Sequence, residues 1–349
     1  YTASVDAVTR HYADMVHASY ADTLAAALEL QSAIRTFTDQ PSADSLSTAR
    51  KAWLTARDWY GQTEAYRFYG GPIDDDDGPE GRINAWPLDE SYVDYVEGRA
   101  NSGVINDRKV AIDKETLAEM NERGGEENIS AGWHAIEFLL WGQDLNDNGP
   151  GNRSFKDFVD GARPNADRRR QYLQVATQLL IDDLRSLVDA WKPGADNYRR
   201  EFEQGGDESL RKIIVGIGSL SRGELAGERM EVALNTQDQE DEHSCFSDNT
   251  HRDIVSNALG IQNVLLGRYV RRDGSTMTGP SLRDLVAQRD AKLAKQVTAR
   301  IEKSVALTRA IQAPFDREIS GGRDAPGPQR VQQTIDSLVQ QSKDLVDAA

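Results

Sequence analysis

Apolar residues recur at three- and four-residue spacing along most of the chain, a pattern typical of amphipathic helices. Residues 3–38 show it at Leu24 and Leu28, and residues 44–68 continue it after a break at Pro41. Ser42 and Asp44 follow that proline and are residues that favour the start of a helix. The pattern therefore predicts two long helices that form a hairpin.

The stretch from Tyr69 to Asn106 differs in composition: it has clustered Gly, Pro and Asp and no helical period. Irregular connections of this length are uncommon inside compact domains unless they carry function. Its aromatic residues, Trp86, Tyr92 and Tyr95, favour packing over disorder. This long loop is either a segment that lines a site or a plain excursion of the chain, and the sequence leaves both open.

Helical spacing returns after the long loop, and no alternating β-type stretch of convincing length interrupts it. The expected helices cover residues 114–123, 127–141, 165–191, 208–239, 249–269, 281–313 and 329–346. Residues 142–164, rich in Gly, Asn, Asp and Pro, are the best candidate for a domain boundary. We therefore predict an all-α protein with an N-terminal helical bundle over 1–145 and a C-terminal bundle over 146–349.

Composition narrows the possible partners. The 349 residues carry a formal charge of -16, which opposes binding to nucleic acid.

No apolar run reaches the roughly 18–20 residues that a membrane-spanning helix needs. The chain begins at Tyr1, which suggests that an export signal has been removed. Its one cysteine, Cys245, forms no intramolecular disulfide and is expected to be a buried thiol.

The strongest candidate chemistry lies in the apolar segment around His134 and Glu137. These side chains are three residues apart on an expected helix, so they share one face within reach of a single ion. Imidazole and carboxylate together suit iron, zinc or copper. The alternative is a buried hydrogen-bonded pair that only organises the core. Because burying two ionisable groups is costly without partners, we favour a functional role.

A second polar cluster spans residues 239–253 at an expected corner between helices. It contains two histidines, His243 and His251, together with several acids and hydroxyls. Helix capping by Ser247 or Asp248 explains part of it, but neither histidine is needed for a cap.

Two standard metal motifs are incomplete in this sequence. The loop Asp144, Asn146, Asn148 matches the first half of a calcium loop, but its twelfth position is Phe155 instead of Glu, so we expect no standard EF-hand. A His-Glu-x-x-His zinc protease needs a second histidine at position 138, which is Phe.

Three segments together resemble the imelysin-like family, which is also classed as M75 peptidases. They are Gly132-x-His134-x-x-Glu137, the segment 78–89 and the segment 240–253, and they resemble the iron-regulated branch of that family. The resemblance implies two similar four-helix bundles with a site at their interface. It also implies an exported protein, periplasmic or lipid-anchored at the cell envelope, with a role in iron or other metal uptake.

The resemblance leads to a specific hypothesis for the site. His134, Glu137 and His243 are the expected metal ligands, and Asp241, Ser247, Asp248 and His251 complete a ligand-binding wall. The loop with Arg82 and Trp86 would close the site. Arg82 would hold an anionic chelate or neutralise Glu137, and the sequence leaves both open.

Three functions follow from these residues. The first is an envelope protein that binds a metal ion or small iron complex and works with other envelope uptake proteins. The second is a zinc metallopeptidase in which His134 and His243 hold zinc and a glutamate activates water. The third is a structural or partner-docking helical module. A catalytic zinc usually has three protein ligands, so we expect binding and no enzymatic activity.

Overall fold

The computed structural model describes residues 3–146 and 148–349. Helices make up about 65% of the chain, which confirms the all-α class. The α-helices are α1 (Val5–Asp39), α2 (Ala43–Thr63), α3 (Glu80–Ile83), α4 (Glu90–Val93), α5 (Lys114–Met120), α6 (Trp133–Trp141), α7 (Ala166–Ala190), α8 (Tyr198–Glu203), α9 (Asp207–Ser219), α10 (Val232–Thr236), α11 (Thr250–Leu266), α12 (Leu282–Arg289), α13 (Ala291–Ala310), α14 (Phe315–Glu318) and α15 (Pro326–Ala348). Segment η4 (Leu220–Glu231), which is π-helical, joins α9 to α10. Four short 3₁₀ turns are η1 (Glu64–Tyr66), η2 (Val104–Asn106), η3 (Phe155–Phe158) and η5 (Gln239–Asp241).

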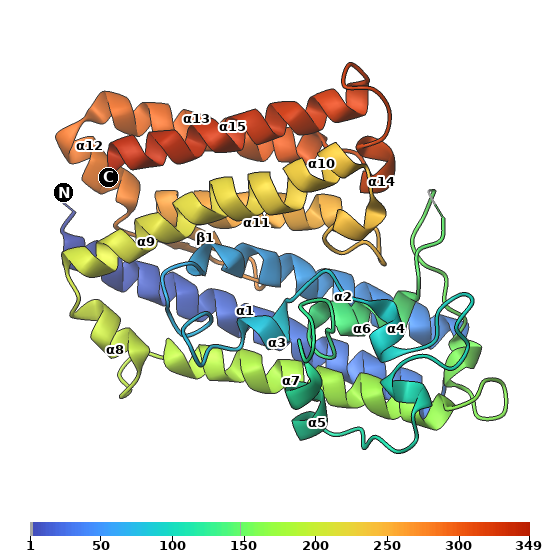
Figure 1. The fold of residues 1–349 in the computed structure, drawn as a ribbon. Helices are drawn as coiled ribbons and strands as arrows, with labels where there is room; N and C mark the ends of the chain where they lie inside the picture. Colours follow the sequence, from blue (N-terminus) through green and yellow to red (C-terminus); the bar gives the residue numbers. More distant parts are fainter. Residues whose placement is uncertain (1–2, 147) are drawn as a thin grey trace.

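The first group of helices is built on the hairpin of α1 and α2. The Ser4 side chain caps α1 by accepting a hydrogen bond from the Ala7 amide, and Ser42 and Ser45 cap α2 reciprocally. α7 packs along α1, and the short α6 contacts both α2 and α7 (Figure 1).

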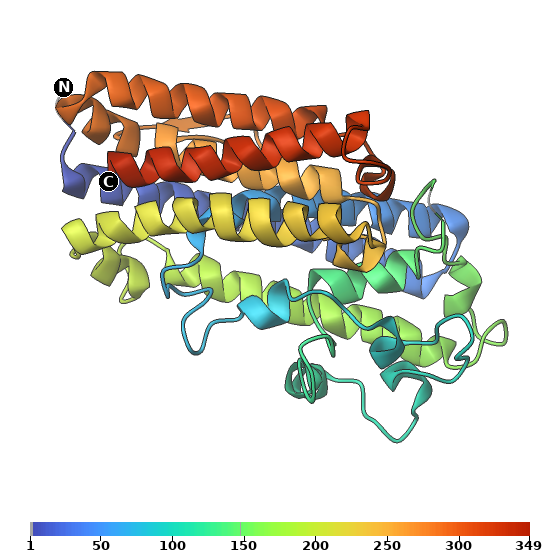
Figure 2. The same cartoon turned by 45° about the horizontal axis from the view of Figure 1, so that its top comes forward.

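The second group consists of α9 with η4, α11, α13 and α15. α11 lies between α2 and α13, and α15 covers η4 and α13, so the second group is stacked on the first (Figures 1 and 2). One continuous hydrophobic core runs through both groups. Helix α7 follows the predicted boundary at 145–146 in the sequence, yet it packs with the first group.

Several helix ends differ from the sequence prediction for identifiable reasons. The helix predicted over 127–141 begins at Trp133, because Gly132 has a φ of 90° that a helix cannot contain. The helix predicted over 281–313 is two helices, and the Asp290 side chain caps the second of them.

A small β-hairpin was not predicted. Gly267 ends α11 in the left-handed conformation, and β1 (Arg268–Val270) then pairs antiparallel with β2 (Thr276–Thr278). Tyr269 of β1 is buried against α1, where its hydroxyl donates to Asp22 over 2.7 Å. The hairpin is too short to show an alternating pattern in the sequence.

No helix in the described part of the chain combines the length and the apolar composition needed to cross a membrane.

Candidate functional site

The three predicted metal ligands, His134, Glu137 and His243, meet where α2, α6 and the corner before α11 come together. α6 supplies His134 and Glu137, the corner supplies His243, and the first turn of α11 supplies Asp253. The Arg57 side chain enters from α2. At most 3% of any of these five residues is exposed, so the cluster is sealed inside the protein.

Gly132 sets the position at which α6 starts. A Cβ atom on this residue would lie 2.4 Å from the carbonyl oxygen of Ile83, and its φ of 90° is strained for any L-residue. The bare glycine lets α6 begin directly against the long loop. The glycine of the Gly-x-His-x-x-Glu motif therefore has a structural role, which is to place His134 in the first turn of α6.

His134 and Glu137 face each other along α6, as their spacing predicts. The Nδ1 atom of His134 lies 2.9 Å from Oε1 of Glu137. The other carboxyl oxygen, Oε2, accepts hydrogen bonds from the amide and the hydroxyl of Ser247, at 2.9 and 2.6 Å. Ser247 therefore connects α6 to the corner before α11.

His243 is oriented in the same way by a second carboxylate. Its Nδ1 atom lies 2.7 Å from Oδ2 of Asp253, and the Ser244 hydroxyl donates to the same oxygen over 2.5 Å. A carboxylate behind Nδ1 fixes the orientation of an imidazole and is the usual arrangement behind metal-bound histidines.

The two imidazoles present their remaining nitrogens to each other. The Nε2 atoms of His134 and His243 are 3.3 Å apart, and the ring centroids are 4.7 Å apart. The Nη2 atom of Arg57 lies 3.1 Å from Nε2 of His243 and 3.5 Å from Nε2 of His134. A cationic guanidinium group thus stands beside the gap between the histidines.

Arg57 is held firmly in this position. It forms a two-point ion pair with Asp253, with distances of 3.1 and 3.2 Å, and its Nη1 atom donates to Asn84 over 2.5 Å. Asn84 in turn donates to Glu64, which is paired with Arg229. Although burial alone would raise it, the pKa of Glu64 is held well below its usual range by Arg229.

Burial decides the protonation of the central groups. It lowers the pKa of His134 and of His243 well below the usual value, and the positive charges of Arg57 and Arg229 act in the same direction. Both imidazoles are therefore neutral. Burial also raises the pKa of Glu137 to about 8, although the two hydrogen bonds from Ser247 oppose that shift. Glu137 is protonated at neutral pH.

These states define a continuous hydrogen-bond chain. Because Oε2 of Glu137 accepts from Ser247, the carboxyl proton sits on Oε1 and is donated to Nδ1 of His134. His134 then carries its own proton on Nε2 and points it at Nε2 of His243, which passes its Nδ1 proton toward Asp253. Loss of one proton from Glu137 would expose a lone pair on each Nε2.

A small cavity opens beside His134 and Glu137. It is lined by Trp86, Pro87, Leu88, His134, Glu137, Glu240, Glu242, Ser244, Cys245 and Phe246. Its volume of about 10 Å³ is close to the minimum for one water molecule. The centroids of the Trp86 and His243 rings are 5.1 Å apart, and Trp86, Pro87 and Leu88 bring the long loop to this cavity.

Four further predicted binding residues have other partners or surroundings. Arg82 is paired with Asp183 of α7 at 3.0 Å. Asp241 accepts a hydrogen bond from Thr236 over 2.7 Å. His251 is partly exposed on the first turn of α11. The Asp248 carboxyl group contacts Asp144.

Sequence reasoning missed Arg57 and Asp253, which complete the cluster. Arg57 lies on the buried face of α2 between Trp53 and Tyr60, so a charge among apolar positions was the available signal. Asp253 resembles an ordinary acidic residue in the first turn of a helix, and nothing in the sequence links it to residue 57.

The histidine cluster is not a finished metal site in its present conformation. Within residues 3–146 and 148–349, no three His, Cys, Asp or Glu side chains are grouped so as to hold an ion. Two nitrogen ligands at about 2.0–2.1 Å from an ion with tetrahedral geometry would stand about 3.3 Å apart. The histidine nitrogens match this separation, whereas the adjacent Arg57 charge opposes a cation.

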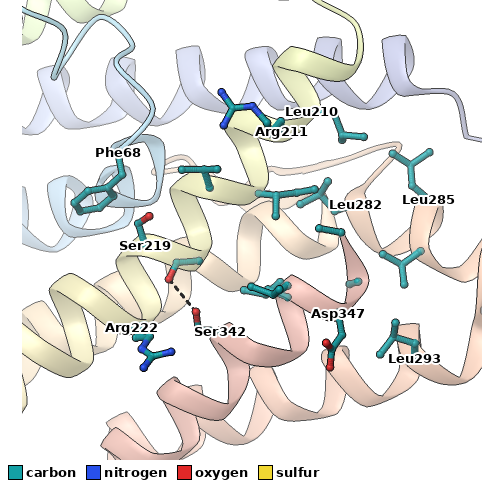
Figure 3. Close-up of a pocket in the computed structure, with 18 of the residues that line it drawn as sticks. Phe68, Leu210, Arg211, Ser219, Arg222, Leu282, Leu285, Leu293, Ser342 and Asp347 are labelled. Carbon is teal, nitrogen blue, oxygen red and sulfur yellow. Dashed lines mark hydrogen bonds between the residues drawn. The ribbon is translucent and has the colours of Figure 1, made fainter.

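A larger cavity lies at a different place in the molecule. It has a volume of about 1550 Å³ and lies between α9, α12 and α15, as Figure 3 shows. Leu210, Leu282, Leu285 and Leu293 give it an apolar lining, and Ser342 on α15 donates to the carbonyl of Gly218. None of the predicted site residues lines it.

Comparisons with known proteins agree with the helical architecture. The imelysin (peptidase M75) family model matches residues 16–345, so this chain belongs to the imelysin family. It is 27% identical over 317 residues to iron-regulated protein A of Synechococcus elongatus, covering 87% of this chain and 75% of that protein.

Two crystal structures share the fold. One, from Parabacteroides distasonis, is described as an iron-regulated protein A precursor; it has a TM-score of 0.72 at 19% identity, covering 99% of this chain and 94% of that one. The other is an imelysin-like protein from Psychrobacter arcticum, with a TM-score of 0.67 at 15% identity, covering 99% and 95%.

Proposed function

We propose that this protein binds an iron ion between Nε2 of His134 and Nε2 of His243, as part of iron uptake at the cell envelope. The observation that carries the proposal is the 3.3 Å separation of two neutral imidazole nitrogens, each with a carboxyl group behind its Nδ1 atom. Neutral imidazole is a good ligand for iron, zinc and copper. The iron-regulated relative supports iron as the natural cargo.

Glu137 acts in this proposal as a positioning residue and as a proton store. Its carboxyl group lies behind His134, at Nδ1, and Ser247 occupies its second oxygen. When Glu137 loses its proton, His134 moves its ring proton to Nδ1 and frees Nε2 for the ion. Iron and one proton therefore compete for the same pair of residues. Direct ligation by Glu137 stays a prediction.

The charge of Arg57 limits the affinity of the two histidines for the ion. Its guanidinium group repels a cation placed between the histidines, and its ion pair with Asp253 holds that charge in place. Two protein nitrogens with water as the remaining ligand make a weaker site than the four ligands of a structural zinc. Weak and reversible binding suits a protein that passes iron on to other envelope uptake proteins.

The small volume of the cavity beside the histidines favours metal binding over peptide cleavage. The cavity beside the histidines has room for about one water molecule, and a peptide segment cannot enter it without a large rearrangement. A peptidase activity that is lost with chelator and in His134→Gln would contradict this part of the proposal.

Titration calorimetry tests the proposal. Metal-free protein is titrated with ferrous iron under anaerobic conditions, and with zinc and copper. We expect one ion per chain, and at least a tenfold loss of affinity in His134→Gln and His243→Gln. His17→Gln, a histidine on α1 outside the cluster, is the control. Equal binding by all four proteins, or no binding by the unmodified chain, would overturn it.

A further inference from the structure

The small cavity beside His134 and Glu137 reaches from the buried cluster to the surface of the protein. Its inner wall is formed by His134 and Glu137, which are buried. Pro87 and Glu240 line the same cavity and are exposed. We refer to this space as the side cavity. It gives the histidine cluster a direct path to solvent.

Glu242 also lines the side cavity, and it is the residue that indicates a passing ligand. It is only 2% exposed, and neither of its carboxyl oxygens has a hydrogen-bond partner in the part of the chain that the structure describes. A buried polar group without a partner destabilises the folded protein and therefore needs an explanation. A carboxyl group in a cavity that no protein group occupies is free to bind a cation.

The lining of the side cavity favours a cation over an anion. Glu137, Glu240 and Glu242 contribute carboxyl groups, and none of the described residues that line the cavity is a lysine or an arginine. A narrow space lined by charges of one sign attracts ions of the opposite sign and repels the others. Carboxylate side chains along a pore select cations in the same way.

Trp86 narrows the side cavity. It is partly exposed, and its ring packs edge-on against the His243 ring at an interplanar angle of 70°. With the Trp86 ring in this position the cavity volume is about 10 Å³, which leaves room for about one water molecule. An iron ion with its full water shell, or a chelate of iron, does not fit into that volume.

We propose that iron enters through the side cavity as a single uncomplexed cation, with Glu240 and Glu242 as successive carboxylates on the route and Trp86 as its gate. This proposal rests on the proposed binding of iron between His134 and His243. The carboxylate oxygens replace part of the water shell of the ion, which displaces any proton that they hold. Glu242 acts on the rate of passage and is not a ligand of the bound ion.

The route defines the form in which iron is accepted. An anionic chelate such as ferric citrate is repelled by the lining and is too large for the cavity. Within the described residues, no three His, Cys, Asp or Glu side chains are grouped so as to hold an ion. The acids of the side cavity therefore suit the passage of an ion and not its storage.

The rates of iron binding and release test this proposal on metal-free full-length protein under anaerobic conditions. Capture of released ferrous iron by an excess of a chromogenic chelator gives the dissociation rate constant, calorimetry gives Kd, and their ratio gives the association rate constant. In Glu240→Gln and Glu242→Gln the association rate constant should fall about tenfold or more, because a lining of one charge raises on-rates by about that factor. Dissociation should slow as well, because the ion leaves by the same route.

Two further variants complete the experiment. Trp86→Ala should speed both association and dissociation, because it widens the side cavity. Asp336→Asn, an exposed acid on α15, is the matched control and should behave as the unmodified chain does. Glu240→Gln changes an exposed side chain, so its result does not depend on a buried substitution. Ferric citrate should not bind to any of these proteins.

Three results would overturn the route while leaving the iron site intact. They are unchanged association rate constants in Glu240→Gln and Glu242→Gln, a loss of affinity in Glu242→Gln that comes only from faster release, and binding of ferric citrate as tight as that of ferrous iron. No binding of ferrous iron by the unmodified chain would instead refute the proposed function and the route together. The two failures are therefore distinguishable.

Discussion

The Nε2 atoms of His134 and His243 lie 3.3 Å apart although 109 positions separate the two residues in the sequence. Each imidazole has a carboxyl group at its Nδ1 atom, Glu137 for one and Asp253 for the other. His243 and Asp253 lie outside the Gly-x-His-x-x-Glu motif, so the motif around His134 supplies only half of the site. The other half is the corner before α11, which the fold brings against α6.

Replacement of Arg57 by Gln tests whether its charge limits the affinity for the ion. The change breaks a buried ion pair and should lower the free energy of unfolding by about 3–5 kcal/mol. It also removes the cation beside the histidines, so zinc should bind more tightly and raise Tm more than in the unmodified protein. Thermal unfolding with and without zinc measures both effects. A zinc-induced shift no larger than that of the unmodified chain would show that Arg57 does not compete with the ion.

Metal binding should release a proton. The pKa of Glu137 is about 8, so at pH 7 the Glu137–His134 pair holds a proton that the ion must displace. Affinity should therefore rise with pH and level off above about pH 8. Calorimetry in two buffers of different ionisation enthalpy gives the number of protons released, with up to one per ion expected at pH 7.

Ser247→Ala provides the matched variant for this pH dependence. It removes the hydroxyl that donates to Glu137 over 2.6 Å and keeps the amide that also donates. Because those hydrogen bonds stabilise the ionised carboxylate, the pKa of Glu137 should rise further, and the midpoint of the metal-binding pH profile should move upward. In Glu137→Gln the rise of metal affinity with pH that comes from ionisation of Glu137 should disappear. An unchanged midpoint in both variants would refute the proton-store role.

The stability of the metal-free protein should fall as pH rises from 7 to 9. The folded-state pKa of Glu242 is about 9 and that of Asp248 about 8, both well above the values of exposed carboxyl groups. The folded state therefore binds more protons than the unfolded state in this range, and by linkage its stability decreases as pH rises. Histidines contribute little here, because they are neutral in both states above an ordinary pKa of about 6.5.

In Glu242→Gln the free energy of unfolding should fall less steeply between pH 7 and 9. The slope should be smaller by up to about 1.4 kcal/mol per pH unit, the value for one proton. Urea unfolding in the presence of chelator, at several pH values, measures it. Parallel pH profiles for the variant and the unmodified protein would mean that Glu242 is ionised in the folded state throughout this range.

Gly132→Ala should destabilise the protein by about 3 kcal/mol, because it combines backbone strain with a collision against the carbonyl oxygen of Ile83. Gly161 has a similar φ of 82° but has open space where a Cβ would be placed. Gly161→Ala should therefore cost only about 1 kcal/mol. Chemical unfolding of both variants separates the collision from the strain, and equal losses would show that the contact with Ile83 is unimportant.

Much of the helical framework follows from the sequence, because helix periods and caps are local. The capped start of α2 at Ser42 and the motif on α6 are examples. Breaks within predicted helices were harder to see: the spacing of apolar residues continues across Asp290, where the chain in fact starts a new helix.

The site was only partly predictable for a related reason. His134 and Glu137 are three residues apart, so their contact is local, and the family resemblance drew attention to His243. The roles of Arg57 and Asp253 depend on how α2 packs against α11, and no short-range sequence pattern predicts that packing. The same applies to Arg82, whose partner Asp183 is on α7.

Anomalous scattering from crystals soaked in ferrous iron or zinc, recorded at the absorption edge of the metal, tests the central claim most directly. The account predicts one strong peak within about 2.0–2.2 Å of Nε2 of both His134 and His243. A peak bound elsewhere, or an undisturbed hydrogen bond between the two imidazoles at full metal loading, would contradict it.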